Sequence, residues 1–154
     1  MKVENLRKDL KNIGQWYYKL IIICSSDKTV DFSLFIDQPF EEVNVNLDLS
    51  EALLSYSKEQ YPLVINDLFV RFFSDRTKVY LLRHINILFD PQLQINPVRL
   101  LENLSKKYKL VVEWPGVYKD KKLIYAEFGH PEYFVCSDYE GKVSILERLI
   151  GKEG

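Results

Sequence analysis

Lysine and threonine follow a long apolar run near the start of the chain, in the order found in phosphate-binding loops. The segment is YKLIIICSSDKTVDFSLF, which spans residues 18–35 and contains Lys28 and Thr29. In such a loop the lysine reaches the β- and γ-phosphates and the threonine hydroxyl binds Mg²⁺. If this protein binds a nucleotide, we expect Asp27, Lys28 and Thr29 to be the residues that contact it.

The glycines that such a loop requires are missing between Cys24 and Thr29. Glycine lets successive amides turn toward a phosphate at backbone angles that other residues resist. Asp27 stands where the motif has its last glycine, and a carboxylate near a phosphate charge costs about 4 kcal/mol at the effective dielectric of a protein surface. The preferred interpretation is therefore an ordinary strand-to-helix turn, and nucleotide binding is the alternative.

A second group of polar residues follows the apolar run at residues 79–82. Arg83, His84 and Asn86 stand there, and open parallel sheets bind their ligands at the carboxyl ends of such strands. A nucleotide hydrolase places carboxylates at this position to hold Mg²⁺ and orient water. Arginine and histidine supply none of the oxygen ligands that Mg²⁺ prefers. The sequence therefore predicts that this edge does not hydrolyse nucleotides in the usual way.

Three roles are open for the basic residues at this edge. Arg83 and His84 can bind an anion, face a partner protein, or pair with Asp27, and an Arg83–Asp27 contact would indicate a site that the protein fills itself. Asp90 is the first carboxylate after the strand. Because Pro91 follows it, we expect Asp90 to cap a turn rather than to bind a metal.

His130 lies close in sequence to Glu127 and Glu132, and with His84 these are side chains of the types that bind zinc or iron. Their spacing matches no metal-ligand motif. We therefore expect His130 and the proline after it to shape a turn, and we predict no metal site.

Lysines are dense between residues 106 and 122, and Tyr108 and Tyr118 lie among them. The lysines are Lys106, Lys107, Lys109, Lys119, Lys121 and Lys122. In a nucleic-acid-binding module, lysines contact phosphates and tyrosines stack on bases. Lys119, Lys121 and Lys122 are the candidates for that role, and the preferred interpretation is a solvated surface with half-buried tyrosines.

Hydrophobic patterning predicts the elements that position these residues. We expect helices at residues 3–13, 29–36, 50–56, 63–73 and 97–107. We expect strands at residues 18–24, 43–47, 79–82, 108–114, 123–128 and 133–136, with 43–47 near a sheet edge and 143–150 as a strand or short helix. Alternating strands and helices predict an α/β fold of three layers, in which helices flank a mainly parallel sheet.

The composition suits one domain over residues 1–154, because 47% of the residues are hydrophobic. The net charge of −1 gives no overall field that would attract nucleic acid or a membrane. No run approaches the roughly 18 apolar residues of a membrane-spanning helix, and the N-terminal segment lacks the apolar core of a signal peptide. We expect a cytoplasmic protein without membrane contact, with Cys24 and Cys136 reduced.

Four motifs in order resemble the BrxF family of small P-loop proteins from bacteriophage-exclusion (BREX) defence systems. They are ILFDP at residues 87–91, PVRLL at 97–101, WPG at 114–116 and YAEFGHPEY at 125–133. The resemblance implies a P-loop NTPase-like fold, ATP with Mg²⁺ as the family's ligand, and other defence proteins as partners. The chain departs from the family at three places: CSSDKT replaces the glycine loop, and Arg83 and Asn86 replace its aspartate and glutamate.

These observations together predict a component of a bacterial phage-defence system that is not a catalyst and acts through protein contacts. No cofactor is expected, oligomers are possible, and nucleic acid would be reached through the complex. Two alternatives remain open. One is an ATPase subunit whose site a partner completes, and the other is a nucleic-acid-binding module.

Overall fold

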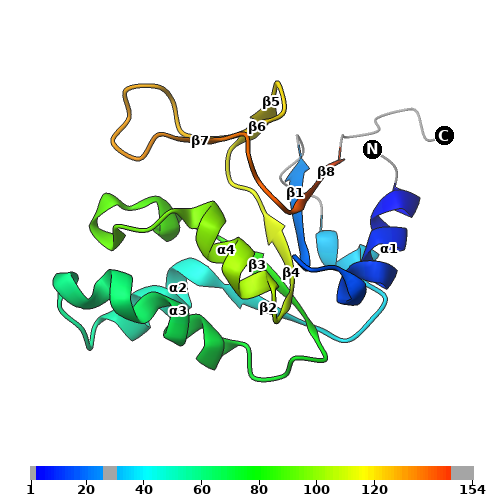
Figure 1. Ribbon diagram of the computed structural model, residues 1–154, viewed down its shortest axis with the longest axis horizontal. Coiled ribbons are helices and arrows are strands. Elements are labelled where there is room, and N and C mark those ends of the chain that lie inside the picture. The colour runs from blue at the N-terminus through cyan, green and yellow to red at the C-terminus, as the bar shows by residue number, and fades with distance from the viewer. Residues whose placement is uncertain (1–2, 26–30, 147–154) are drawn as a thin grey trace.

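A five-stranded parallel sheet forms the centre of the computed structural model, which describes residues 3–25 and 31–146 (Figure 1). Its strands are β1 (Leu20–Ser25), β2 (Phe40–Asn44), β3 (Val79–Arg83), β4 (Lys109–Glu113) and β8 (Lys142–Leu146). They lie in the order β2-β3-β4-β1-β8, and every neighbouring pair is parallel. Thus β3, β4 and β1 are interior strands, which agrees with their continuous apolar sequences.

Helices cover both faces of this sheet, so the predicted three-layer α/β arrangement is confirmed. The α-helices are α1 (Val3–Asn12), α2 (Val45–Leu53), α3 (Tyr61–Phe72) and α4 (Pro97–Ser105). Short 3₁₀ segments are η1 (Ile13–Gln15), η2 (Phe32–Phe35), η3 (Lys58–Gln60), η4 (Asn86–Phe89) and η5 (Pro91–Leu93). Figure 1 shows α1 on one side of the sheet and α2, α3 and α4 on the other.

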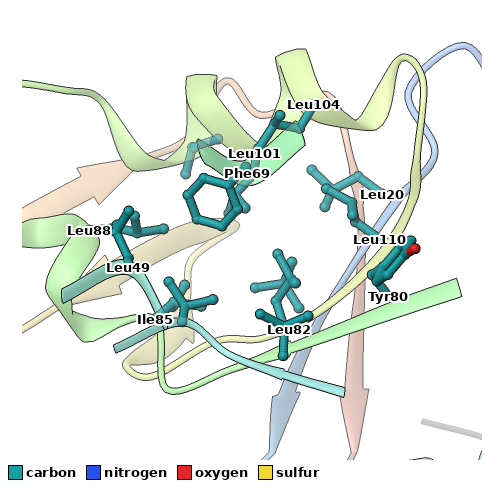
Figure 2. Close-up of a cluster of buried hydrophobic side chains, with 14 of the residues drawn as sticks. Leu20, Leu49, Phe69, Tyr80, Leu82, Ile85, Leu88, Leu101, Leu104 and Leu110 are labelled. Carbon is teal, nitrogen blue, oxygen red and sulfur yellow. The ribbon is translucent and has the colours of Figure 1, made fainter. Parts of the chain in front are cut away.

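Alternate residues of each interior strand belong to two separate cores. In β1, Leu20 and Ile22 join the core under α2, α3 and α4, while Ile21 and Ile23 join the core under α1. Figure 2 shows the larger core, where Phe69 of α3 packs among leucines of the helices and the sheet. Full burial of each such side chain contributes roughly 1.5–3 kcal/mol, which is why the sheet is fixed in place.

A second sheet with three short antiparallel strands follows β4. Its strands are β5 (Val117–Lys119), β6 (Lys122–Tyr125) and β7 (Phe134–Cys136), in that spatial order. One face packs on the larger core, to which the buried Leu123 and Cys136 belong. The predicted strand at 123–128 ends early, because Ala126 adopts a left-handed backbone with φ 63°.

The chain between residues 43 and 56 differs from the prediction. Alternating residues predict a strand at 43–47, but β2 ends at Asn44, whose side chain accepts a hydrogen bond from the Leu47 amide at 3.1 Å and caps α2. Val45 and Leu49 are buried on the core face of this helix. The helix predicted at 50–56, with Ser50 as its cap, therefore begins five residues earlier, and Ser50 lies inside it. The expected position near a sheet edge is confirmed, because β2 is an edge strand.

The remaining elements match their predictions closely, with boundaries shifted by a few residues. Of the segment predicted as a helix at 29–36, the described part is the 3₁₀ segment η2. Of the segment at 143–150, the described part is strand β8. Among residues 3–25 and 31–146, no helix has the length and apolar character needed to cross a bilayer.

Candidate functional site

The carboxyl ends of β1 and β4 lie side by side, and the described parts of the connections that follow these strands pack on opposite faces of the sheet. Of the connection from β1 to β2, residues 31–39 are described, and Phe35 and Ile36 join the smaller core on the α1 face. The connection from β4 to β8 packs on the opposite face through the small sheet. Open α/β sheets bind ligands at the carboxyl ends of the strands where such a reversal occurs, and at this edge the structure has a cavity lined by residues at and after the ends of β3 and β4.

Arg83 ends β3, lines this cavity and is held between two carboxylates. Its Nε lies 3.4 Å from Glu113 Oε1, and its Nη1 lies 3.6 Å from Glu42 Oε2. Glu113 ends the neighbouring strand β4, and Glu42 belongs to β2 on the other side. The parallel register brings these charges together, because β3 is bonded to β2 and β4 along its length.

The electrostatic surroundings keep Arg83 charged. Burial by itself lowers the pKa of this guanidinium. The hydrogen bond and charge of Glu113, with the charges of Glu42 and Asp31, raise the pKa by more than burial lowers it, so the net shift is upward. Two carboxylates against one guanidinium leave this group with a net negative charge. The arrangement therefore does not favour an anion such as phosphate at Arg83.

His84 follows Arg83 with a backbone φ of 55°, a left-handed conformation that is uncommon outside glycine. Its carbonyl accepts a hydrogen bond from the Asn46 amide at 2.8 Å. The side chain of Asn46 in turn accepts a hydrogen bond from the Ile87 amide at 2.8 Å. These two bonds fix the turn after β3 against the start of α2, and they leave the His84 side chain exposed.

Asn86 lies where two open cavities meet. A cavity of about 280 Å³ is lined by Arg83, His84, Asn86, Glu113, Trp114 and Pro115. A wider hollow of about 610 Å³ shares Asn86 and Pro115 and extends to the residues after β6. The Asn86 amide donates a hydrogen bond to the Tyr125 hydroxyl at 3.0 Å, and so links the large sheet's edge to the small sheet.

The WPG motif connects the two sheets, and its Trp114 and Gly116 both contact Ile124 of the small sheet. Trp114 is fully buried, and its indole N–H donates to the carbonyl of Ile124 at 3.0 Å. A Cβ at Gly116 would lie 1.9 Å from the same carbonyl oxygen, so only glycine fits there. The motif thus brings β6 over the end of β4, and Trp114 and Pro115 form one wall of the cavity at the ends of β3 and β4.

The structure places the other predicted residues of this edge as follows. Asp90 accepts a hydrogen bond from the Gln92 amide at 2.9 Å, so its predicted role as a turn cap is confirmed. The predicted nucleotide contacts Asp27, Lys28 and Thr29 lie outside the described residues. The predicted pair between Arg83 and Asp27 is untested, because Asp27 is one of these residues. Within the described residues, Arg83 pairs with Glu113 and Glu42.

His130 shapes a turn, as predicted. Its Nδ1 accepts a hydrogen bond from the Glu132 amide at 3.0 Å, and its carbonyl accepts one from the Tyr133 amide at 3.0 Å. Within residues 3–25 and 31–146, no three His, Cys, Asp or Glu side chains gather closely enough to hold a metal ion.

The lysines of residues 106–122 form two separate groups. Lys106, Lys107 and Lys109 lie at the amino end of β4, whereas Lys119, Lys121 and Lys122 lie on the β5–β6 hairpin beyond its carboxyl end (Figure 1). Tyr108 is buried against Phe73, and Tyr118 bonds to Tyr139. Both tyrosines therefore make contacts inside the protein, and the hairpin lysines form a basic group separate from the lysines at the amino end of β4.

Sequence reasoning missed Glu42 and Glu113, which complete the charged group around Arg83. A signal for Glu113 is present in the sequence, because Arg83 and Glu113 each follow a buried run, VYLL and LVV, at the same strand position. Two parallel neighbours with opposite charges at their ends form a predictable pair. Neither a protein-family profile nor a curated protein matches this sequence.

Proposed function

We propose that this protein is a non-catalytic subunit of a bacterial phage-defence complex, with a degenerate P-loop NTPase-like fold, that acts through contacts with other proteins. The observation that carries the non-catalytic part is the position of Arg83. A guanidinium held by two carboxylates occupies the strand end where a nucleotide hydrolase needs acidic groups for Mg²⁺ and water. The defence context comes from the resemblance to BrxF alone.

The strand order supports the P-loop-like part of the proposal. Two strands, β3 and β4, separate β1 from β2, and all five strands are parallel. A phosphate-binding loop joins a strand to a helix, so the proposal expects this loop after β1. The carboxyl ends of β1 and β4, where the connections diverge to opposite faces, correspond to the place where an open α/β sheet binds its ligand.

Glu113 supports one alternative, in which a partner completes an ATPase site. Its carboxylate stands at the end of β4, next to β1, and is only 16% exposed. A partner that drew Arg83 away from Glu113 would leave this carboxylate free to orient water or Mg²⁺. In the isolated chain, Arg83, Glu42 and Glu113 together carry a net negative charge, which disfavours binding of the anionic ATP.

Calorimetric titration with Mg-ATP tests the two possibilities directly. We expect no binding heat for the wild type or for Lys28→Ala. Heat that appears with the wild type and disappears in Lys28→Ala would support nucleotide binding and contradict the inert site. ATP turnover by the complex that is lost in Glu113→Gln would identify the partner-completed enzyme.

Affinity purification from the native host tests the proposed context. We expect defence-system proteins to be recovered with the tagged chain, and we expect recovery to be unchanged in Lys28→Ala, because the contacts do not depend on nucleotide. Recovery of no defence protein would remove the context and leave only the fold.

A further inference from the structure

The outer face of the small sheet carries a row of apolar side chains that neither core covers. Val117, Ile124 and Val135 are directly opposite one another across β5, β6 and β7. Their neighbours Leu123 and Cys136 point to the inner face and are buried. Val117 and Val135 are 57% and 39% exposed, and none of the three packs against either core. The row is therefore an apolar strip in which Val117 and Val135 are exposed and Ile124 between them is half-buried.

Lysines without ion-pair partners among the described residues lie next to this strip. Lys119 and Lys122 are directly opposite each other in the next position of β5 and β6, where like charges destabilise a sheet. Lys121 lies in the turn between them. Across the described residues, none of these three side chains forms an ion pair or a side-chain hydrogen bond, and all three are exposed.

The hairpin turn itself is strained. Asp120 and Lys121 have φ values of 54° and 61°, and the two-residue turn that requires such angles strongly favours Asn-Gly. Asp120 tolerates this backbone, so the hairpin keeps a like-charge pair and one residue, Lys121, that is poorly suited to its backbone. Local conflicts of this kind are expected at functional sites, where the sequence is selected for binding and not for stability.

We propose that the outer face of β5, β6 and β7 binds an acidic amphipathic segment of a partner protein. The apolar side of that segment covers Val117, Ile124 and Val135, and its carboxylates lie against Lys119, Lys121 and Lys122. Charge complementarity carries the choice, because three lysines stand against the single carboxylate of Asp120 on this hairpin. The inference rests on the proposed function, since it names the surface through which the protein contact is made.

The side chains of the strip distinguish this partner from a nucleic acid. Single-stranded nucleic acid binds by stacking its bases on aromatic rings beside a basic groove. The strip next to the lysines is made of valine and isoleucine, which offer no ring for stacking. Aliphatic side chains beside cations instead match the leucine-rich and glutamate-rich faces of an amphipathic helix.

A display library of random-sequence peptides tests the surface with defined probes. We expect peptides selected on the wild-type chain to combine acidic and aliphatic residues and to shift the NMR signals of β5, β6 and β7. Lys119→Glu/Lys122→Glu should weaken them by about tenfold or more, and Val117→Asp should also weaken them. Reversal of Lys58 and Lys107, two exposed lysines elsewhere, is the matched control and should change little.

Two counter-probes and one comparison decide the outcome. Tighter binding to single-stranded DNA or to phosphatidylserine vesicles, lost in the same hairpin variants, would overturn the protein partner in favour of those ligands. Selection of no acidic peptide would overturn the surface. If the native-host purification recovers defence proteins and Lys119→Glu/Lys122→Glu leaves that recovery unchanged, the inference fails while the proposed function stands. ATP turnover by the isolated chain would contradict the proposed non-catalytic function, whereas peptide binding to β5, β6 and β7 would remain valid evidence for the surface.

Discussion

Nε of Arg83 lies 3.4 Å from Oε1 of Glu113, across two neighbouring parallel strands that end at the same edge of the sheet. The two side chains are 21% and 16% exposed, so the pair is mostly removed from water. Glu113 is the nearer counterion of Arg83, and Glu42 adds a second carboxylate at 3.6 Å. The stability of this edge therefore depends on Arg83.

We first predict that Arg83→Met lowers the free energy of unfolding by about 1–3 kcal/mol, because it leaves a mostly buried carboxylate without its partner. A double-mutant cycle with Glu113→Gln should give a coupling energy of about 0.5 kcal/mol or more. Urea denaturation measures both quantities. Arg7→Met is the control, since the Arg7–Asp37 pair is exposed and 3.9 Å apart, and surface pairs of this kind contribute about 0–1 kcal/mol. A coupling energy near zero would show that Arg83 and Glu113 are independent.

A second prediction concerns Glu102, which is a buried carboxylate on α4 with only 5% of its surface exposed. Its Oε1 lies 2.8 Å from Arg99 Nη1, and its Oε2 accepts a hydrogen bond from the Glu140 amide at 2.6 Å. We expect Glu102→Ala to cost about 1–3 kcal/mol, because the Glu140 amide loses its acceptor and Arg99 keeps only Asp138 as a partner. Glu102→Gln keeps one acceptor and should cost less. Thermal unfolding that ranks the two variants equally would contradict this account.

Much of the fold could be predicted from the sequence, because continuous apolar runs mark the interior strands wherever they lie in the chain. The segment at residues 43–47 could not, because Val45 and Leu47 suit either a strand or a helix and only the cap at Asn44 decides. The candidate site was predicted in part. Arg83, His84 and Asn86 follow a recognisable strand, but the pairing of Arg83 with Glu113 joins residues 30 positions apart and depends on which strands are neighbours.

A third prediction follows from the ion pair between Arg99 and Asp138, whose Nη2 and Oδ1 lie 2.7 Å apart. Hydrogen bonds from Arg99 and then Cys136 hold the pKa of Asp138 below its ordinary value of 3.8. A carboxyl with a lowered folded pKa adds stability above the unfolded pKa, and that stability is lost as the pH falls through the folded pKa. Asp138→Asn should therefore lower stability near neutral pH and flatten its decline in acid. Urea midpoints measured from neutral pH to well below 3.8 would contradict this if the two proteins declined in parallel.

A fourth prediction concerns Gly116 in the joint between the two sheets. An alanine Cβ there would lie 1.9 Å from the Ile124 carbonyl oxygen, so β5 and β6 must separate to admit it. We expect Gly116→Ala to lower the free energy of unfolding by about 1–3 kcal/mol, the usual range for overpacking. Gly14→Ala is the matched control, because its nearest neighbour is a lysine carbon at 3.8 Å. Equal stabilities of the two variants in urea would show that the joint is loose.

The last prediction uses the strained hairpin turn at Asp120 and Lys121, both of which have positive φ. Asp120→Asn/Lys121→Gly supplies the residues that this turn favours and should raise the free energy of unfolding by about 0.4–1 kcal/mol. Lys122→Gly is the control, because Lys122 lies in strand β6 outside the turn, where glycine weakens a strand. If the turn kept Lys121 for binding, the same stabilised variant should bind the selected acidic peptides more weakly, so that stability rises while affinity falls. Unfolding curves and peptide titrations on one preparation measure both changes, and a rise in both would mean that the strain in this turn serves no binding role.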